Sequence, residues 1–237
     1  MITLYQYPPA YDVPTSVSPY CTKVELYFRL TARTYETALG SNLKSPNKAV
    51  PYVRWPDGEL SAESDEIIGR LEGEGEGESL DAGLAPADAT RGREFAELAE
   101  GVLYYGCLHA RFGEADCWPH QKESVKQLVP WLLAPVAVPL IRHLQIKKCL
   151  AHGVGGEHGY GKVEDAVAKL ADALGDKPYM LGDRVRTADC AVWANLLGCA
   201  ATSVDSPVRK AVRDRKPLMD YVARLAKDAK LDLPAWA

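Results

Sequence analysis

A serine and a cysteine stand at positions 18 and 21, where Pro19 favours the first turn of a helix. The mouth of a helix offers unpaired backbone N–H groups and the positive end of the helix dipole. A thiol brought there prefers its anionic form, and a hydrogen bond from the Ser18 hydroxyl would lower its pKa further. Because the thiolate is the nucleophile, such a site would activate a thiol at neutral pH. The alternative is that Ser18 only caps the helix.

A second pair of polar residues, Glu63 and Ser64, stands at the start of another predicted helix. The N-terminus of that helix offers N–H groups and the Ser64 hydroxyl to a carboxylate, and Glu63 could pair with an ammonium group. Together they would suit the head group of an amino acid, which carries both charges. A simple helix cap beside a solvated glutamate is the alternative.

Short strands and helices that would position these residues alternate through the first 75 residues. The signals are alternation before Pro8-Pro9, helical spacing after Ser18-Pro19, and a hairpin turn at Pro56-Asp57-Gly58. The predicted elements are the strand Met1–Tyr7, a helix from Ser18 to about Ala32, the strand Thr34–Ala38, the hairpin of Pro51–Trp55 with Glu59–Ala62, and a helix that Ser64 caps. The predicted order is β-α-β-β-β-α.

Beyond residue 75 the apolar residues recur at helical spacing. The Gly/Glu run Glu72–Ser79 contains no apolar residue and predicts a solvated linker. Helices are predicted at 95–103, within 121–150 (kinked or split at Pro130, Pro135 and Pro139), at 163–174, at 187–200, which is apolar all round and hence buried, and at 217–229. The sequence therefore predicts a small α/β unit over 1–75 and an all-helical unit over 76–237.

Composition excludes several classes of protein. The 237 residues carry a net charge of −4, which argues against nucleic acid as a main partner. We expect no membrane span, because no apolar run reaches the roughly 18–20 residues that one needs. The first residues lack the features of a signal peptide, and the six cysteines show no CxxC pair, so we expect a cytoplasmic protein with reduced thiols. No metal is expected, since His152 and His158 have no third ligand in view.

Four short motifs, in this order, resemble the glutathione S-transferase superfamily over nearly the whole chain. They are Ser18-Pro19-Tyr20-Cys21-Thr22-Lys23-Val24, Val50-Pro51, Glu63-Ser64, and Leu181-Gly182-Asp183 followed by Thr187-Ala188-Asp189. The long connection Tyr7–Ser18, the stretch Lys23–Leu30 and Leu174-Gly175-Asp176-Lys177 resemble the branch of failed-axon-connections and metaxin proteins. The resemblance implies a thioredoxin-like N-terminal domain with a mixed sheet, followed by a helical-bundle C-terminal domain.

One position departs from the family's pattern. Arg186 stands where the family usually has Ser or Thr, so Thr187 is expected to cap the helix instead. Asp189 is expected to be a structural residue at the start of that helix rather than a catalytic one.

The same resemblance implies that the thiol at Ser18 belongs to bound glutathione. Some classes of the superfamily use a tyrosine at the end of the first strand, which makes Tyr7 a further candidate. The bond before Pro51 is implied to be cis, so that the backbone of Val50 pairs with glutathione as an added strand. Lys48 would meet the glycyl carboxylate or be a surface lysine. A homodimer is also implied.

Cys21 lies one helical turn inside the helix that begins after Ser18. In a CxxC motif it would be the second thiol, but Ser18 replaces the first, so two-thiol chemistry is not available. A one-cysteine thioltransferase would require Cys21 to be exposed. Packing of Cys21 against the sheet is the alternative.

We therefore expect a glutathione transferase-like enzyme whose thiolate attacks a small apolar electrophile or a peroxide in a cleft between the domains. Trp118 and Trp131 would line the apolar part of that cleft, or simply pack. A non-catalytic interaction or scaffold protein with the same fold is the alternative function.

Overall fold

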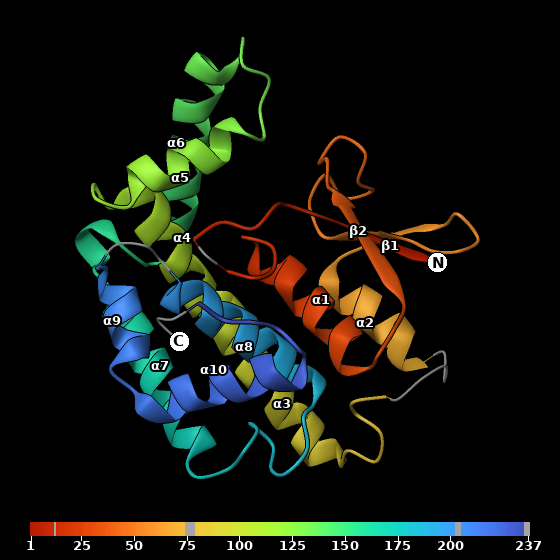
Figure 1. Cartoon of the computed structure of the whole chain (residues 1–237). Coiled ribbons are helices and arrows are strands. Elements are labelled where there is room, and N and C mark those ends of the chain that lie inside the picture. The colour runs from red at the N-terminus through yellow and green to blue at the C-terminus, as the bar shows by residue number, and fades with distance from the viewer. Residues whose placement is uncertain (12, 74–78, 202–204, 235–237) are drawn as a thin grey trace.

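The computed structural model describes residues 1–11, 13–73, 79–201 and 205–234 (Figure 1). Its N-terminal part is built on a four-stranded mixed sheet in the order β2-β1-β3-β4. The strands are β1 (Ile2–Gln6), β2 (Tyr35–Leu39), β3 (Tyr52–Arg54) and β4 (Leu60–Ala62); β1 runs parallel to β2 and antiparallel to β3, and β3 runs antiparallel to β4. With α1 (Pro19–Leu30) and α2 (Ser64–Gly73), this confirms the predicted order β-α-β-β-β-α and the thioredoxin-like fold.

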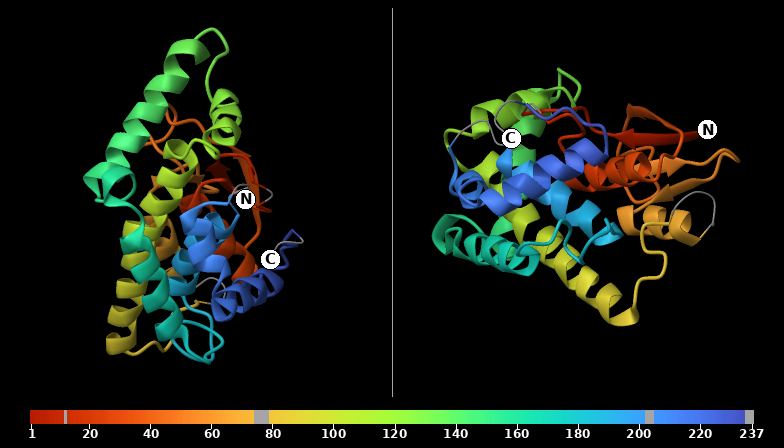
Figure 2. Two further views of the ribbon diagram at one scale, coloured as in Figure 1. Left: turned by 90° about the vertical axis from the view of Figure 1, so that its left-hand side faces the viewer. Right: turned by 60° about the horizontal axis from the view of Figure 1, so that its bottom comes forward.

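The rest of the described chain is helical, as predicted. The helices are α3 (Pro86–Leu98), a π-helical turn (Ala99–Leu103), α4 (Tyr104–Gly113), α5 (Trp118–Lys126), α6 (Ala134–Ala151), α7 (Gly161–Leu174), α8 (Thr187–Ala200), α9 (Pro207–Arg213) and α10 (Lys216–Asp228), with a 3₁₀ turn at Gly156–His158. Helix α8 is buried along almost its whole length and packs against α1, so one apolar core runs through both parts. Figure 2 shows α8 inside the helical part and α5 with α6 at its periphery.

The structure confirms the predicted interruption of 121–150 near Pro130 and contains a short helix that the sequence did not predict. The stretch 121–150 splits into α5 and α6 around Pro130, while Pro139 lies inside α6. The seven-residue α9 was not predicted, because it is too short to show a periodic apolar pattern. In the part that the structure describes, no helix is long and apolar enough to cross a bilayer, and no group of three metal-ligating side chains forms.

Glu72 corrects the interpretation of the Gly/Glu run as a solvated linker. Glu72 belongs to α2, and its carboxylate accepts hydrogen bonds from the Tyr27 hydroxyl at 2.6 Å and from the backbone N–H groups of Leu80 at 2.9 Å and Asp81 at 3.1 Å. The carboxylate therefore holds together the helix end and the chain that follows. The remainder of the run, 74–78, lies outside the described residues.

The start of α8 corrects a second expectation. Arg186, not Thr187, is the N-cap residue, and the buried Asp189 carboxylate accepts a hydrogen bond from its backbone N–H at 2.8 Å. Thr187 instead bonds to Asp81 through its hydroxyl at 2.6 Å and its N–H at 3.0 Å. Asp189 has the structural position that the sequence predicted for it.

Candidate functional site

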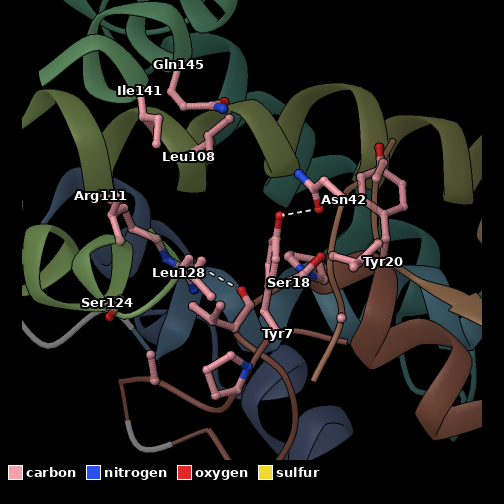
Figure 3. Close-up of a pocket in the computed structure, with 18 of the residues that line it drawn as sticks. Tyr7, Ser18, Tyr20, Asn42, Leu108, Arg111, Ser124, Leu128, Ile141 and Gln145 are labelled. Carbon is pink, nitrogen blue, oxygen red and sulfur yellow. Dashed lines mark hydrogen bonds between the residues drawn. The ribbon is translucent and has the colours of Figure 1, made fainter. Parts of the chain in front are cut away.

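A cleft of about 1700 Å³ lies between the sheet end of the N-terminal part and helices α4 to α6 (Figure 3). Its walls are the connection from β1 to α1, the loop from β2 to β3, the start of α2, and side chains of α4, α5 and α6. Seven of the eight predicted site residues line it: Tyr7, Ser18, Lys48, Val50, Pro51, Glu63 and Ser64. The exception is Cys21.

Ser18 lies at the mouth of α1, where the sequence predicted it. It is the N-cap residue, with φ −88° and ψ 120°, and Pro19 follows at the first helical position. Its side chain makes no capping hydrogen bond to the helix, although its carbonyl accepts from the N–H of Thr22 at 3.0 Å. A half-buried hydroxyl at a helix mouth, on the wall of a cleft, can therefore turn to an anionic ligand.

Cys21 is fully buried, with Ser18 and Ser16 as hydrogen-bonding neighbours of its thiol. Burial raises the pKa of its thiol to about 11, even though hydrogen bonds from Ser18, Ser16 and the backbone of Tyr7 favour the thiolate. At neutral pH the thiol is therefore protonated and shielded. The structure places Cys21 in the packing position that the sequence left as one of two alternatives.

Tyr7 follows β1 and points its hydroxyl across the cleft toward the loop after β2 (Figure 3). The hydroxyl donates to Asn42 Oδ1 at 2.8 Å. Burial raises the pKa of Tyr7, and the hydrogen bond to Asn42 opposes this only in part. The phenol is therefore neutral and engaged with Asn42, a residue that no sequence motif singled out.

The Val50–Pro51 peptide bond is cis, as the resemblance implied. Pairing between β1 and β3 begins at Tyr5 opposite Tyr52, so Val50 precedes the ladder and borders the cleft. Lys48 is exposed nearby, with a left-handed backbone at φ +59°.

Glu63 and Ser64 form the rim at the start of α2. The Glu63 carbonyl accepts from the N–H of Ile67 at 3.0 Å, so Ser64 is the first helical residue rather than the cap. Glu63 has a left-handed backbone at φ +69°, which is costly for a residue with a side chain and is concentrated at functional sites. Its exposed carboxylate accepts a hydrogen bond from Asn47 Nδ2 at 2.6 Å, while Ser64 is buried against the cleft.

A buried lysine that the sequence reasoning missed lies under the acidic end of the cleft. Lys23 Nζ lies 2.5 Å from Asp65 Oδ1 and 2.7 Å from Glu100 Oε1, both of which line the cleft. Burial lowers the pKa of Lys23, but the two carboxylates outweigh it, so the pKa is raised overall. Burial also raises the pKa of Glu100, against the attraction of Lys23. The π-helical turn that carries Glu100 is a local distortion of a kind often found at functional sites.

The opposite wall of the cleft combines apolar side chains with a polar group. Leu108, Leu128 and Ile141 supply apolar surface. Arg111 is buried there and is bonded to backbone carbonyls, and the Tyr11 hydroxyl donates to Gln121 Oε1 at 2.5 Å. These residues have no motif, because they come together only when α4 and α5 pack beside the β1–α1 connection.

The two tryptophans expected in the cleft do not line it. Trp118 packs against Phe112 and under the Arg142 guanidinium, and Trp131 is 79% exposed at the end of the α5–α6 hairpin. The short connection between the two helices turns Trp131 outward. Spacing along the sequence gave no sign of this direction.

The arrangement suits a ligand with several polar groups and a thiol. Ser18 can donate a hydrogen bond to an anionic sulfur at the mouth of α1. The start of α2 and the carboxylates of Glu63 and Asp65 can hold the carboxylate and the ammonium of an amino acid. An apolar acceptor would lie against α4 to α6.

Two family models match the chain. The glutathione S-transferase N-terminal domain matches residues 19–119, and the glutathione S-transferase C-terminal domain matches residues 163–225. The chain is also similar to isoprene-epoxide–glutathione S-transferase of Rhodococcus sp. (strain AD45), at 28% identity over 96% of this chain and 98% of that protein.

One further relative and one solved structure are also similar to this chain. Failed axon connections of Drosophila melanogaster is 26% identical over 95% of this chain, which spans 57% of that protein. Among solved structures, the β-etherase LigF of Sphingobium sp. strain SYK-6 superimposes with a TM-score of 0.66 at 18% identity, covering 97% of both chains, and so shares the fold.

Proposed function

Because the chain belongs to the glutathione S-transferase family, we propose that it binds glutathione in the cleft and adds the glutathione thiolate to a small apolar electrophile. One observation carries the proposal. Ser18, Val50 with Pro51, and Glu63 with Ser64 come from three separate segments and line a single cleft. A protein that only kept the fold would have no need of all three together.

Each part of the tripeptide has a partner of matching chemistry along this cleft. The backbone of Val50 pairs with the peptide bonds as an added strand. Ser64 and the N–H groups at the start of α2 receive the α-carboxylate, and Glu63 or Asp65 receives the ammonium. Lys48 lies on the same rim, where it meets the glycyl carboxylate.

Ser18 is the group that we assign to the sulfur. Its hydroxyl lies at the helix mouth on the cleft wall, whereas the Tyr7 hydroxyl is bonded to Asn42 and the Cys21 thiol is fully buried. A hydrogen bond from Ser18 to the sulfur stabilises the thiolate and lowers the pKa of the bound thiol. Thiol exchange through Cys21 is disfavoured by the burial of that thiol and its raised pKa.

We propose an epoxide of a small hydrocarbon as the electrophile. The relative from Rhodococcus carries isoprene epoxide in its name, and Leu108, Leu128 and Ile141 offer an apolar wall opposite Ser18. In such a reaction the sulfur forms a bond to an epoxide carbon, the carbon–oxygen bond breaks, and the oxygen takes a proton from water. Holding the thiolate beside the epoxide supplies much of the acceleration.

The test combines binding with turnover. Glutathione should raise the Tm of the wild-type protein, because a ligand that binds only the native state stabilises it. Ser18→Ala should lower kcat/KM for conjugation of glutathione to a small epoxide by about 100-fold, the usual loss when one donor to a developing or bound anion is removed. Cys21→Ala should conjugate at close to the wild-type rate.

Three results would contradict the proposal. A wild-type Tm that glutathione does not change, with no conjugation, would leave a non-catalytic interaction protein. Loss of activity in Cys21→Ala alone would assign the chemistry to Cys21. Unchanged kcat/KM in Ser18→Ala would remove Ser18 from the reaction. The homodimer implied by the resemblance stays a prediction, which sedimentation equilibrium would test.

A further inference from the structure

The α5–α6 hairpin presents an apolar face to solvent. Along α6 and the residues before it, Leu132, Val136, Leu140 and Leu144 recur every fourth position, so they share one side of the helix. They are 70%, 75%, 54% and 52% exposed, and Trp131 and Leu133 beside them are 79% and 59% exposed. We call these six residues the hairpin face. Contiguous exposed apolar surface of this kind marks an interaction site.

The inner side of the same hairpin is already occupied. Phe112, Val125 and Val138 form a small apolar cluster between α4, α5 and α6, and Ile141 lines the cleft. Helix α6 is therefore apolar on two sides, of which only one is packed within the described chain. Packing within the described chain leaves the hairpin face exposed.

Helix α6 carries charges of one sign, whereas Lys126 at the end of α5 forms an ion pair with Glu123 at 2.7 Å. Residues 124–156 contain no Asp or Glu, but they contain Lys126, Arg142, Lys147 and Lys148, in a chain whose net charge is −4. Lys147 is exposed and lies on the side of α6 that carries the hairpin face, as does His143. Apolar residues with an aromatic residue at the tip and basic residues behind them are the composition of a helix that lies in the interface of an anionic membrane.

The position of the hairpin fits a flat partner. The connection between α5 and α6 projects beyond the rest of the molecule in Figure 1 and in the left view of Figure 2, and Trp131, which belongs to this connection, is 79% exposed.

We propose that the hairpin face docks this protein on the surface of a membrane that contains anionic lipid, without crossing it. Trp131, Leu132, Leu133 and Val136 enter the boundary between headgroups and acyl chains, and Lys147 lies near the lipid phosphates. Leu128 and Ile141 on the inner side of the hairpin border the cleft, so docking brings the cleft toward the lipid surface. Apolar molecules dissolved in the bilayer would then lie close to its mouth.

Flotation of the full chain with vesicles tests the proposal. The wild-type protein should float with vesicles of phosphatidylcholine and phosphatidylglycerol, and only weakly with phosphatidylcholine alone, since each basic residue near an anionic surface contributes to binding. The double variant L132E/L140E should partition at least about tenfold less, because two charges would enter the interface. Leu60→Glu is the matched control: Leu60 is 42% exposed on β4, away from the hairpin, and should float like the wild type.

Trp131 provides an independent readout. Its emission should shift to shorter wavelength on addition of the anionic vesicles, and Trp131→Phe should remove that shift. Far-UV circular dichroism of each variant should match the wild type, because the changed side chains are exposed. The proposal is wrong if the wild type does not float with anionic vesicles, or if L132E/L140E floats equally well. It is also wrong if the wild type does not bind vesicles and is a dimer in sedimentation that L132E/L140E converts to a monomer. The hairpin face would then join two copies of the chain.

Discussion

Arg111 on α4 donates a hydrogen bond from Nη1 to the carbonyl oxygen of Val17, the residue before Ser18, at 2.9 Å. Its Nη2 donates to the carbonyl of Gly198 on α8 at 3.0 Å, and its guanidinium lies 4.8 Å from the centre of the Tyr11 ring. One buried side chain thus ties the helical part to the connection that ends at Ser18. We regard Arg111 as a positioning residue for the mouth of α1.

Arg111→Met should therefore lower the rate of conjugation, because Arg111 holds the connection that ends at Ser18. Without the bond to Val17, the connection gains freedom and Ser18 is no longer held beside the sulfur. We expect kcat/KM for conjugation to fall at least about tenfold, since small misplacements of catalytic groups are costly. The pH profile of conjugation should shift to higher pH, because the bound thiol would lose part of its stabilisation. A purely structural role would lower stability and leave that profile in place.

Arg213→Met is a matched control for this variant. Arg213 Nε donates to the carbonyl of Ala200 at the end of α8, so it too binds an α8 carbonyl, but it does not line the cleft. Removal of Arg213 should lower the free energy of unfolding without shifting the pH profile of conjugation. Equal shifts in both variants would contradict the positioning role of Arg111.

Lys23 joins the two parts of the protein through charges under the cleft. Lys23→Met should destabilise the fold by about 3 kcal/mol, because removing one partner leaves the buried Glu100 carboxylate uncompensated. The double variant Lys23→Met with Glu100→Gln should recover part of the loss, since the buried group is then a neutral amide and the Asp65 carboxylate is exposed to water. Urea unfolding of the four proteins in this cycle measures the coupling. Strictly additive losses would show that the pair does not interact.

The sequence predicted the site residues that belong to local motifs and missed those that packing assembles. Ser18, Val50 with Pro51, and Glu63 with Ser64 each stand at the start of an element, where capping and turn chemistry is visible along the chain. Lys23 and Arg111 carry no such sign, because their partners lie on other elements. Their one signal is a charge inside an otherwise buried helix stretch, which requires a partner.

The sequence also did not predict the directions in which individual side chains point. Periodicity predicted helical character near Trp131 but not that the α5–α6 turn would expose the ring. Cys21 was left between exposed and buried for the same reason: a position one helical turn inward is compatible with both, and only the folded chain shows that the thiol is buried next to Ser16 and Ser18.

Labelling with a thiol reagent follows from the burial of Cys21. The raised pKa of about 11 leaves little thiolate at pH 8, and the closed packing excludes the reagent. We expect mass spectrometry to find Cys21 unmodified in the native protein and fully modified in urea. Rapid labelling of Cys21 in the native state would show that the helix mouth opens, and would restore thiol exchange as an alternative function.

Asp189 gives a pH dependence of stability with a definite sign. Burial raises the pKa of its carboxyl to about 6, against hydrogen bonds from the N–H groups of Met180 and Arg186 and from the Tyr221 hydroxyl. In an unfolded chain the carboxyl group of an aspartate has a pKa of about 4. Between these two values the folded chain holds more protons, so this group's contribution to stability is full at low pH and is lost as the pH rises through about 6. The free-energy difference between wild type and Asp189→Asn should therefore fall by about 2 kcal/mol from pH 4 to pH 7. Urea unfolding of both proteins at several pH values measures it, and a difference that stays constant or grows with pH would contradict the raised pKa.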